Sequence, residues 1–321
     1  MRARLRGAQN FSAVLCALFA CGWAANAAAY CRTMSCELGE DPAHPCPRDA
    51  QDCVTQGQPL HWASACLRYS VQVDGSPLSG LDADQVQVFV AQAFKDWQSA
   101  TCPGGGSPRF EAQFQGFVSC NRRESVCGGA DKNVNVVMFH DQGWTEGPSR
   151  IGLTTPMGGV ESGVVLDADV EINSQDYSFK ADATGMMSTS LRYVLTHELG
   201  HFLGLAHSQV SGAVMSTGYQ SEPRSRSLIS ADDAAAICAA FPPGPALSCG
   251  TPPAPAYDAC ALKPGEQPPC KLASVTQDAR SCGCHLADSS RSRSLSPFAA
   301  LGLLFCGLAS RRVRRKRAAR A

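Results

Sequence analysis

The sequence predicts an α+β domain in which helices pack on a β-sheet. Runs of alternating or continuous apolar residues at 67–73, 133–140 and 163–173 are typical of strands. Apolar residues recur at helical spacing in 85–97 and 191–199. The chain has 321 residues, of which 44% are hydrophobic, which is enough for one sizeable core with appendages.

The first two strands differ in expected burial. Residues 67–73 place Leu67, Tyr69, Val71 and Val73 on one side, which predicts a half-buried strand at an edge or at the start of the sheet. Residues 133–140 are almost continuously apolar, which indicates burial on both faces. We expect His140, at the end of this strand, to be structural or solvated rather than a metal ligand.

The third strand alternates apolar and acidic residues. We expect a solvated acidic face, since carboxylates are ordinarily exposed, with calcium binding as the alternative because Ca²⁺ prefers oxygen ligands. The residues expected to face the core are Val164, Leu166, Ala168, Val170 and Ile172, and the acidic ones are Asp167, Asp169 and Glu171.

Helix boundaries follow from capping residues. Asp82 suits the N-cap of the helix that includes 85–97, and hydroxyls at 188–190 suit the start of the helix that includes 191–199. Ser230 is expected to cap a short helix that runs through Ala240 and stops before Pro242.

The second of these helices continues into the sequence HELGHFLGLAH at 197–207. Residues four apart lie on one helix face, so His197 and His201 can bind the same metal ion. Glu198 lies beside the ion and can accept a proton from water that the ion activates. Gly204 permits the left-handed turn that ends a helix, so the chain can return His207 as a third ligand. Three ligands leave one position open, which is typical of catalytic zinc.

These five positions resemble the zinc signature of the metzincin metallopeptidases, and Met215 stands where that family places a methionine turn under the metal. The sequence HELGHFLGLAHS, followed by Ala-Val-Met, is most similar to that of the matrixins. The likeness covers roughly residues 60–241. The resemblance implies the metzincin (zincin-like) fold, in which a mixed, twisted sheet carries helices and a cleft lies above the zinc helix. Tyr219 stands four residues after Met215, whereas metzincins with a tyrosine ligand place it two residues after, so no ligand role is carried over to it.

The resemblance also implies that a sheet edge beside the cleft pairs with extended substrate. We assign this role to 163–173 or to the adjoining segment that includes Gly152, Leu153 and Thr154.

Matrixins are typically kept latent by a propeptide cysteine, and the sequence around Cys46 is only weakly similar to that motif. We expect Cys46 to be in a disulfide instead.

The cysteine content indicates an oxidising compartment. Of 17 cysteines, two lie in the N-terminal segment, one in a late apolar run and two in Cys282-Gly283-Cys284, which leaves 12, enough for six disulfides. A zinc cluster is the alternative, but the N-terminal cysteines lack paired CxxC spacing.

Charge argues against nucleic acid as a partner. The formal net charge is zero, but three basic residues lie in the N-terminal segment and seven at 311–321. The rest of the chain contains 18 basic and 28 acidic residues, a formal net charge of −10. A protein with this net charge repels phosphate backbones.

Composition divides the chain into five parts. Residues 1–29 read as a secretory signal peptide, 30–66 as a Cys-rich extension, 67–241 as the matrixin-like domain and 242–296 as a stalk rich in Pro and Cys.

The last part, residues 297–321, combines a short apolar segment with a basic tail. Together with Cys282 and Cys284, this tail resembles the Myxo-type sorting signals of exported bacterial proteins. A plain tail anchor is the alternative. We therefore expect export to the outside or the cell surface of a Gram-negative bacterium, with membrane attachment through the tail.

The sequence thus predicts a secreted or surface-anchored zinc endopeptidase. His197, His201 and His207 would bind Zn²⁺, and Glu198 would act as general base in the hydrolysis of protein or peptide substrates. The alternative is a disulfide-rich surface adhesion module with structural zinc. Such a site normally uses four protein ligands, so three histidines and a neighbouring carboxylate favour the enzyme.

Overall fold

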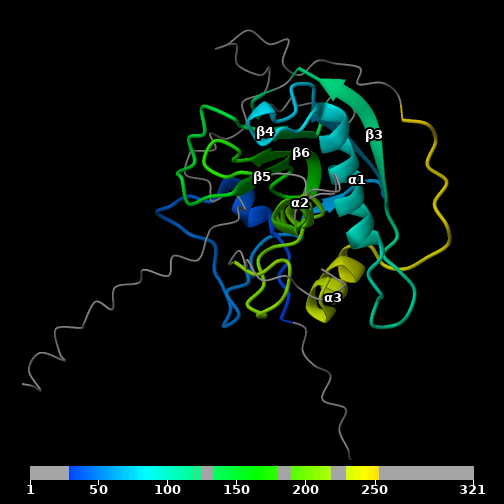
Figure 1. Ribbon diagram of the computed structural model, residues 1–321. Helices are drawn as coiled ribbons and strands as arrows, with labels where there is room; N and C mark the ends of the chain where they lie inside the picture. The colour runs from blue at the N-terminus through cyan, green and yellow to red at the C-terminus, as the bar shows by residue number, and fades with distance from the viewer. Residues whose placement is uncertain (1–28, 120, 124–132, 180–188, 218–228, 253–321) are drawn as a thin grey trace, which may run out of the picture.

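The structure, a computed structural model, describes residues 29–119, 121–123, 133–179, 189–217 and 229–252 (Figure 1). Several predicted features therefore lie outside the described residues: the signal peptide up to 28, Ser188, Tyr219, and the stalk and tail from 253 onward. Within the described part of the chain, no helix is both long enough and apolar enough to cross a bilayer.

The sheet is mixed, as predicted, and its strands follow the order β1-β6-β4-β2-β3, with β5 paired to β6. Strand β5 runs antiparallel to β6, and the other pairs are parallel. The strands are β1 (His61–Trp62), β2 (Cys66–Gln72), β3 (Glu111–Val118), β4 (Val136–Phe139), β5 (Gly152–Gly158) and β6 (Val164–Ile172).

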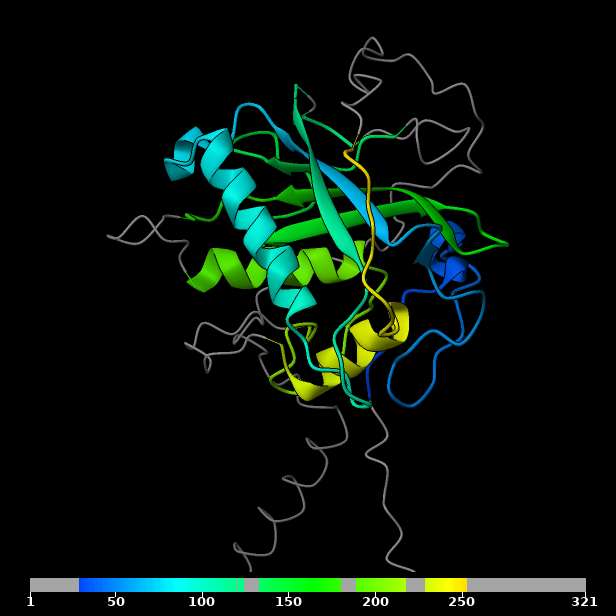
Figure 2. The ribbon, with the colours of Figure 1, turned by 90° about the vertical axis from the view of Figure 1, so that its right-hand side faces the viewer.

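In the part of the chain that the structure describes, three α-helices accompany the sheet: α1 (Ala83–Gln98), α2 (Thr189–Phe202) and α3 (Ala231–Ala240). The short 3₁₀ helices η1 (Ser35–Gly39) and η2 (Pro77–Ser79) precede α1. The predicted caps of α1 and α3 are confirmed, because the side chains of Asp82 and Ser230 accept from the backbone N–H groups of Gln85 and Asp233. Figure 2 shows α1 (cyan) crossing α2 (green), with α3 (yellow) below them in this view.

One hydrophobic core joins both long helices to one face of the sheet. Its sheet side comes from alternate residues of β2, β4 and β6, such as Tyr69, Val137 and Val170. The intervening residues Val136 and Met138 of β4 belong to a second apolar cluster. Strand β4 is therefore buried on both faces, as predicted.

The predicted edge position of the first strand is wrong. Strand β2 lies between β3 and β4, so both of its edges are paired. Both of its faces are also covered toward its end, since Ser70 and Gln72 are buried alongside Tyr69 and Val71. The strand ends at Gln72, which leaves Val73 outside it and 50% exposed.

The solvated acidic face predicted for β6 is also wrong. Asp167, Asp169 and Glu171 are all buried. Asp169 accepts a hydrogen bond from the backbone N–H of Val136, and Glu171 pairs with Arg123 and with His140. Protein partners thus compensate the burial of these two charges.

A register shift opposite Gly158 also changes which side chains of β6 face the core. The core receives Val165, whereas Val164 and Leu166, which were expected there, are only half-buried. Beyond this point the core-facing residues Ala168, Val170 and Ile172 are as predicted.

Four disulfides account for all the described cysteines, which confirms the prediction of pairing, including that of Cys46. They are Cys31–Cys53, Cys36–Cys46, Cys66–Cys249 and Cys102–Cys238. The third bond fixes the described start of the stalk, 242–252, which runs past β3 in Figure 2 and accepts a hydrogen bond from Gln113 at Gly250.

Candidate metal centre

Helix α2 places two imidazoles one turn apart. His197 and His201 are each only 1% exposed, and their Nε2 atoms lie 3.1 Å apart. Ring centroids 4.8 Å apart, with planes at 80°, show that the two rings meet edge to face.

Gly204 turns the chain so that a third imidazole joins them. Helix α2 ends at Phe202, and Gly204 has φ +87°, a left-handed conformation that glycine adopts without strain. The N–H of Leu205 then donates back to the carbonyl of Gly200. His207 is half-buried, and one ring nitrogen of each of the three histidines lies within 4.8 Å of the other two.

Backbone carbonyls orient the two helical imidazoles. Nδ1 of His197 donates to the carbonyl of Val214 over 2.6 Å, and Nδ1 of His201 donates to that of Leu205 over 2.8 Å. Each Nε2 is therefore left with its lone pair toward the other rings, which is the form that binds metal. Burial, followed by the nearby imidazoles, lowers the pKa of His197 to about 3 and that of His201 well below its usual value. Both are neutral at neutral pH.

The donor set fits zinc. Two nitrogens bound at about 2.0–2.1 Å in a tetrahedral shell lie roughly 3.3–3.4 Å apart, close to the 3.1 Å between His197 and His201. Neutral imidazole is a preferred ligand of this ion. Within the described residues, this triad is the only cluster of three metal-ligating side chains.

The segment that ends at Met215 packs against α2. A Cβ on Gly200 would lie 2.8 Å from Trp97 and still closer to Met215, so only glycine fits between them. Asp233, at the start of α3, accepts from the N–H groups of Val214 and Met215 over 2.8 and 3.1 Å. Asp233 therefore fixes the segment whose carbonyl orients His197.

Strand β5 lies against Glu198. Thr154 Oγ1 is 2.8 Å from Glu198 Oε2 and 2.9 Å from the backbone oxygen of Glu198. A Cβ on Gly152 would lie 2.8 Å from Glu198 Oε1, so this glycine makes room for the carboxylate. Leu153 is fully buried. Among the described strands, β5 pairs only with β6, so its second edge has no strand partner.

The predicted residues thus divide into two groups. His197, His201 and His207 come together, with Glu198, Thr154 and Met215 close to them. His140 instead pairs with Glu171 over 2.8 Å, which agrees with the structural role expected for it. Sequence reasoning missed Asp233 and the hydroxyl of Thr154, because their contacts join residues 18 to 44 positions apart.

Comparison with known families agrees with this geometry. The family model for matrixin, a peptidase family, matches residues 130–241. The match includes the three histidines, Glu198 and Met215, and it ends where the predicted domain ends. No curated protein matches the chain. The match supports a metallopeptidase with zinc as its metal and with protein or peptide substrates, and it does not favour the adhesion module.

Proposed function

We propose that this protein is an exported zinc endopeptidase in which His197, His201 and His207 hold the metal and Glu198 is the general base. The observation that carries the proposal is the triad of imidazoles, of which His197 and His201 are buried and neutral, with Glu198 beside these two on the same helix. Zinc bound there would activate a water molecule and polarise the scissile carbonyl. Glu198 would accept the proton of that water and deliver it to the leaving amine.

The free edge of β5 is proposed to bind the substrate backbone. An extended peptide can add to an unpaired strand edge through main-chain hydrogen bonds. Gly152, Leu153 and Thr154 lie at this edge beside Glu198, so a peptide paired there would pass the general base.

Export and surface attachment are further parts of the proposal. Four disulfides in the described residues are typical of an oxidising compartment. The signal-like N-terminus and the Myxo-like tail suggest export and retention at a bacterial cell surface.

A digestion experiment tests the proposed function. Purified, zinc-loaded protein is expected to cleave casein, to lose this activity in a chelator and to regain it when zinc is restored. Zinc binding without chelator-sensitive cleavage would instead support the adhesion module.

Thr154 gives a sharper test of the general base. We expect Thr154→Val to lower kcat about tenfold or more with little change in KM, because a hydrogen bond to a charged group is worth about 1.5–3 kcal/mol. Thr155→Val is the matched control, because the hydroxyl of Thr155 makes no hydrogen bond within the described structure. Equal kinetics for the two variants would contradict the role given to Thr154.

A further inference from the structure

Residues 29–62, here called the collar, lie across the loop that links α2 to His207. The N–H of Thr33 donates to the carbonyl of Gly204 over 3.1 Å, and the N–H of Ala206 donates to that of Cys31 over 3.0 Å. Arg32 and Leu205 form an antiparallel bridge between these two bonds. The collar and the loop of the third histidine are therefore paired backbone to backbone.

Collar side chains bind carbonyls at the end of α2 and just beyond it. Trp62 Nε1 donates to the oxygen of Phe202 over 2.8 Å, and Arg32 Nε donates to that of Gly204 over 2.9 Å. The last carbonyls of a helix have no partner within the helix, so such donors fix its end. The ring of Trp62 also packs on that of Phe202, with centroids 5.0 Å apart.

Thr33 connects the collar to a metal-binding imidazole. Its hydroxyl donates to the carbonyl of Leu205 over 3.0 Å, and this oxygen also accepts from Nδ1 of His201. Thr33 is 2% exposed, so the bond is shielded from water. The hydroxyl thus helps to hold the acceptor that orients His201.

The close approach of the collar, like the turn itself, favours glycine at position 204. A Cβ at this position would lie 2.7 Å from the carbonyl oxygen of Leu60 and 3.4 Å from Arg32 Nη2. The guanidinium of Arg32 also donates to Leu60, so it ties the two ends of the collar together at this glycine.

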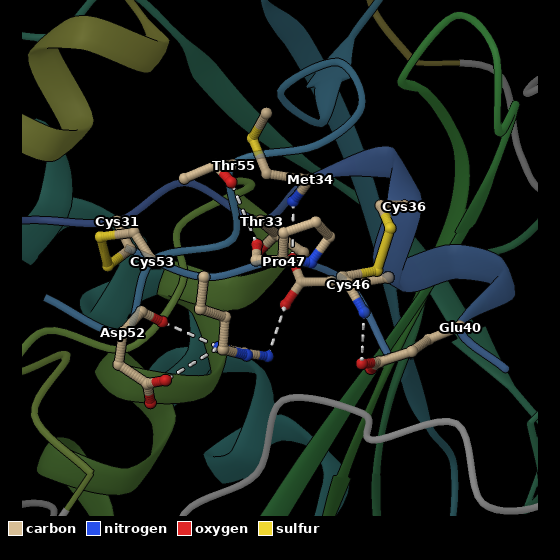
Figure 3. A network of polar contacts seen from close by, with 12 residues as sticks. Cys31, Thr33, Met34, Cys36, Glu40, Cys46, Pro47, Asp52, Cys53 and Thr55 are labelled. Atoms are coloured by element: carbon tan, nitrogen blue, oxygen red, sulfur yellow. Dashed lines mark hydrogen bonds and ion pairs between the residues drawn. A yellow bond between two sulfur atoms is a disulfide. The ribbon is translucent and has the colours of Figure 1, made fainter. Parts of the chain in front are cut away.

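Disulfides, internal hydrogen bonds and pairing with the sheet fix the conformation of the collar. The disulfides Cys31–Cys53 and Cys36–Cys46 lie on either side of its hydrogen-bond network, which Figure 3 shows from close by. Thr55 donates to the carbonyl of Pro47, and the N–H of Cys46 donates to Glu40. At its far end the collar becomes β1, which pairs with β6. A segment built into the sheet in this way is poorly suited to leave as a propeptide.

We propose that the collar is a permanent part of the mature protein and that Thr33 is a positioning residue for the metal centre. The collar holds the loop from Gly204 to Ala206 in the shape that presents His207 and orients His201. This inference rests on the proposed zinc site, but it does not depend on which reaction the site performs.

The full mature protein and its variants provide the test, with zinc affinity measured by competition with a chelator. Thr33→Val is expected to weaken zinc binding about tenfold, the low end of the range for residues that support metal ligands. The matched control is Thr55→Val, which removes an exposed collar hydroxyl that bonds to Pro47 and not to the loop. Equal zinc affinity for Thr33→Val and the unaltered protein would overturn the proposal.

If Thr33→Val folds poorly, a second pair of variants tests the same proposal. Trp62→Phe removes the donor to Phe202 but keeps a ring, and is expected to weaken zinc binding several-fold. Its control, Trp144→Phe, loses only a bond to the carbonyl of Gly147. Identical zinc affinity in these two variants would count against the collar.

Mass analysis of the mature N-terminus tests separately whether the collar is retained in the mature protein. A start at or before Cys31 is expected, whereas a fully zinc-binding protein that begins after Trp62 would overturn the proposal. If zinc affinity falls in Thr33→Val while even the unaltered protein cleaves nothing, the collar inference stands and the peptidase function fails.

Discussion

Glu198→Gln is expected to lower kcat/KM for peptide cleavage by about 10²–10⁴-fold, the range for loss of a general base. The glutamine side chain would keep the size of the original and a hydrogen bond to Thr154, but an amide does not accept a proton from water near neutral pH. The histidines are untouched, so the variant should bind one zinc ion with unchanged affinity. Steady-state kinetics and metal analysis on the same preparation measure both quantities.

The matched control is Glu161→Gln, which makes the same chemical change at an exposed turn between β5 and β6. It should retain full activity. Cleavage by Glu198→Gln at the rate of this control would remove Glu198 from the mechanism, whatever the state of the metal.

Asp233→Ala is expected to give the largest loss of stability, about 3–5 kcal/mol in the free energy of unfolding, because each buried donor left unsatisfied costs about 1–3 kcal/mol. The Asp233 carboxylate is 1% exposed and accepts from three backbone N–H groups, those of Val214, Met215 and Ser230. Burial raises the pKa of Asp233, but these hydrogen bonds oppose the shift.

The same variant should weaken zinc binding about 10–100-fold, because Val214 supplies the carbonyl that orients His197. Urea unfolding with the disulfides intact and chelator competition measure the two effects. Asp84→Ala is the control, since Asp84 is an exposed first-turn residue of α1, where a carboxylate contributes about 0.3–1 kcal/mol. Similar unfolding free energies and zinc affinities for the two variants would contradict the role assigned to Asp233.

The sequence predicted those features that depend on local periodicity. The i, i+4 spacing of His197 and His201 fixes them on one helix face, and Gly204 marks the end of that helix. The continuous apolar run of β4 predicted a strand buried on both faces, and Asp82 and Ser230 predicted two helix starts. Each of these signals lies within a few residues of the element that it specifies.

Features that depend on contacts between distant segments could not be predicted in this way. The alternation of apolar residues in β3 breaks near Gly116, where its register with β2 shifts, so this strand was missed. The burial of Asp169 follows from its bond to β4, 33 residues away. The bond between Thr154 and Glu198 requires β5 to lie against α2, which no local pattern encodes.

The composition of the zinc shell tests the central claim most directly. X-ray absorption at the zinc edge, with metal analysis, is expected to show one ion per chain bound by three imidazole nitrogens at about 2.0–2.1 Å and one oxygen from solvent. A protein without zinc, or an ion whose fourth ligand is another side chain, would contradict the assignment of a catalytic metal centre to His197, His201 and His207.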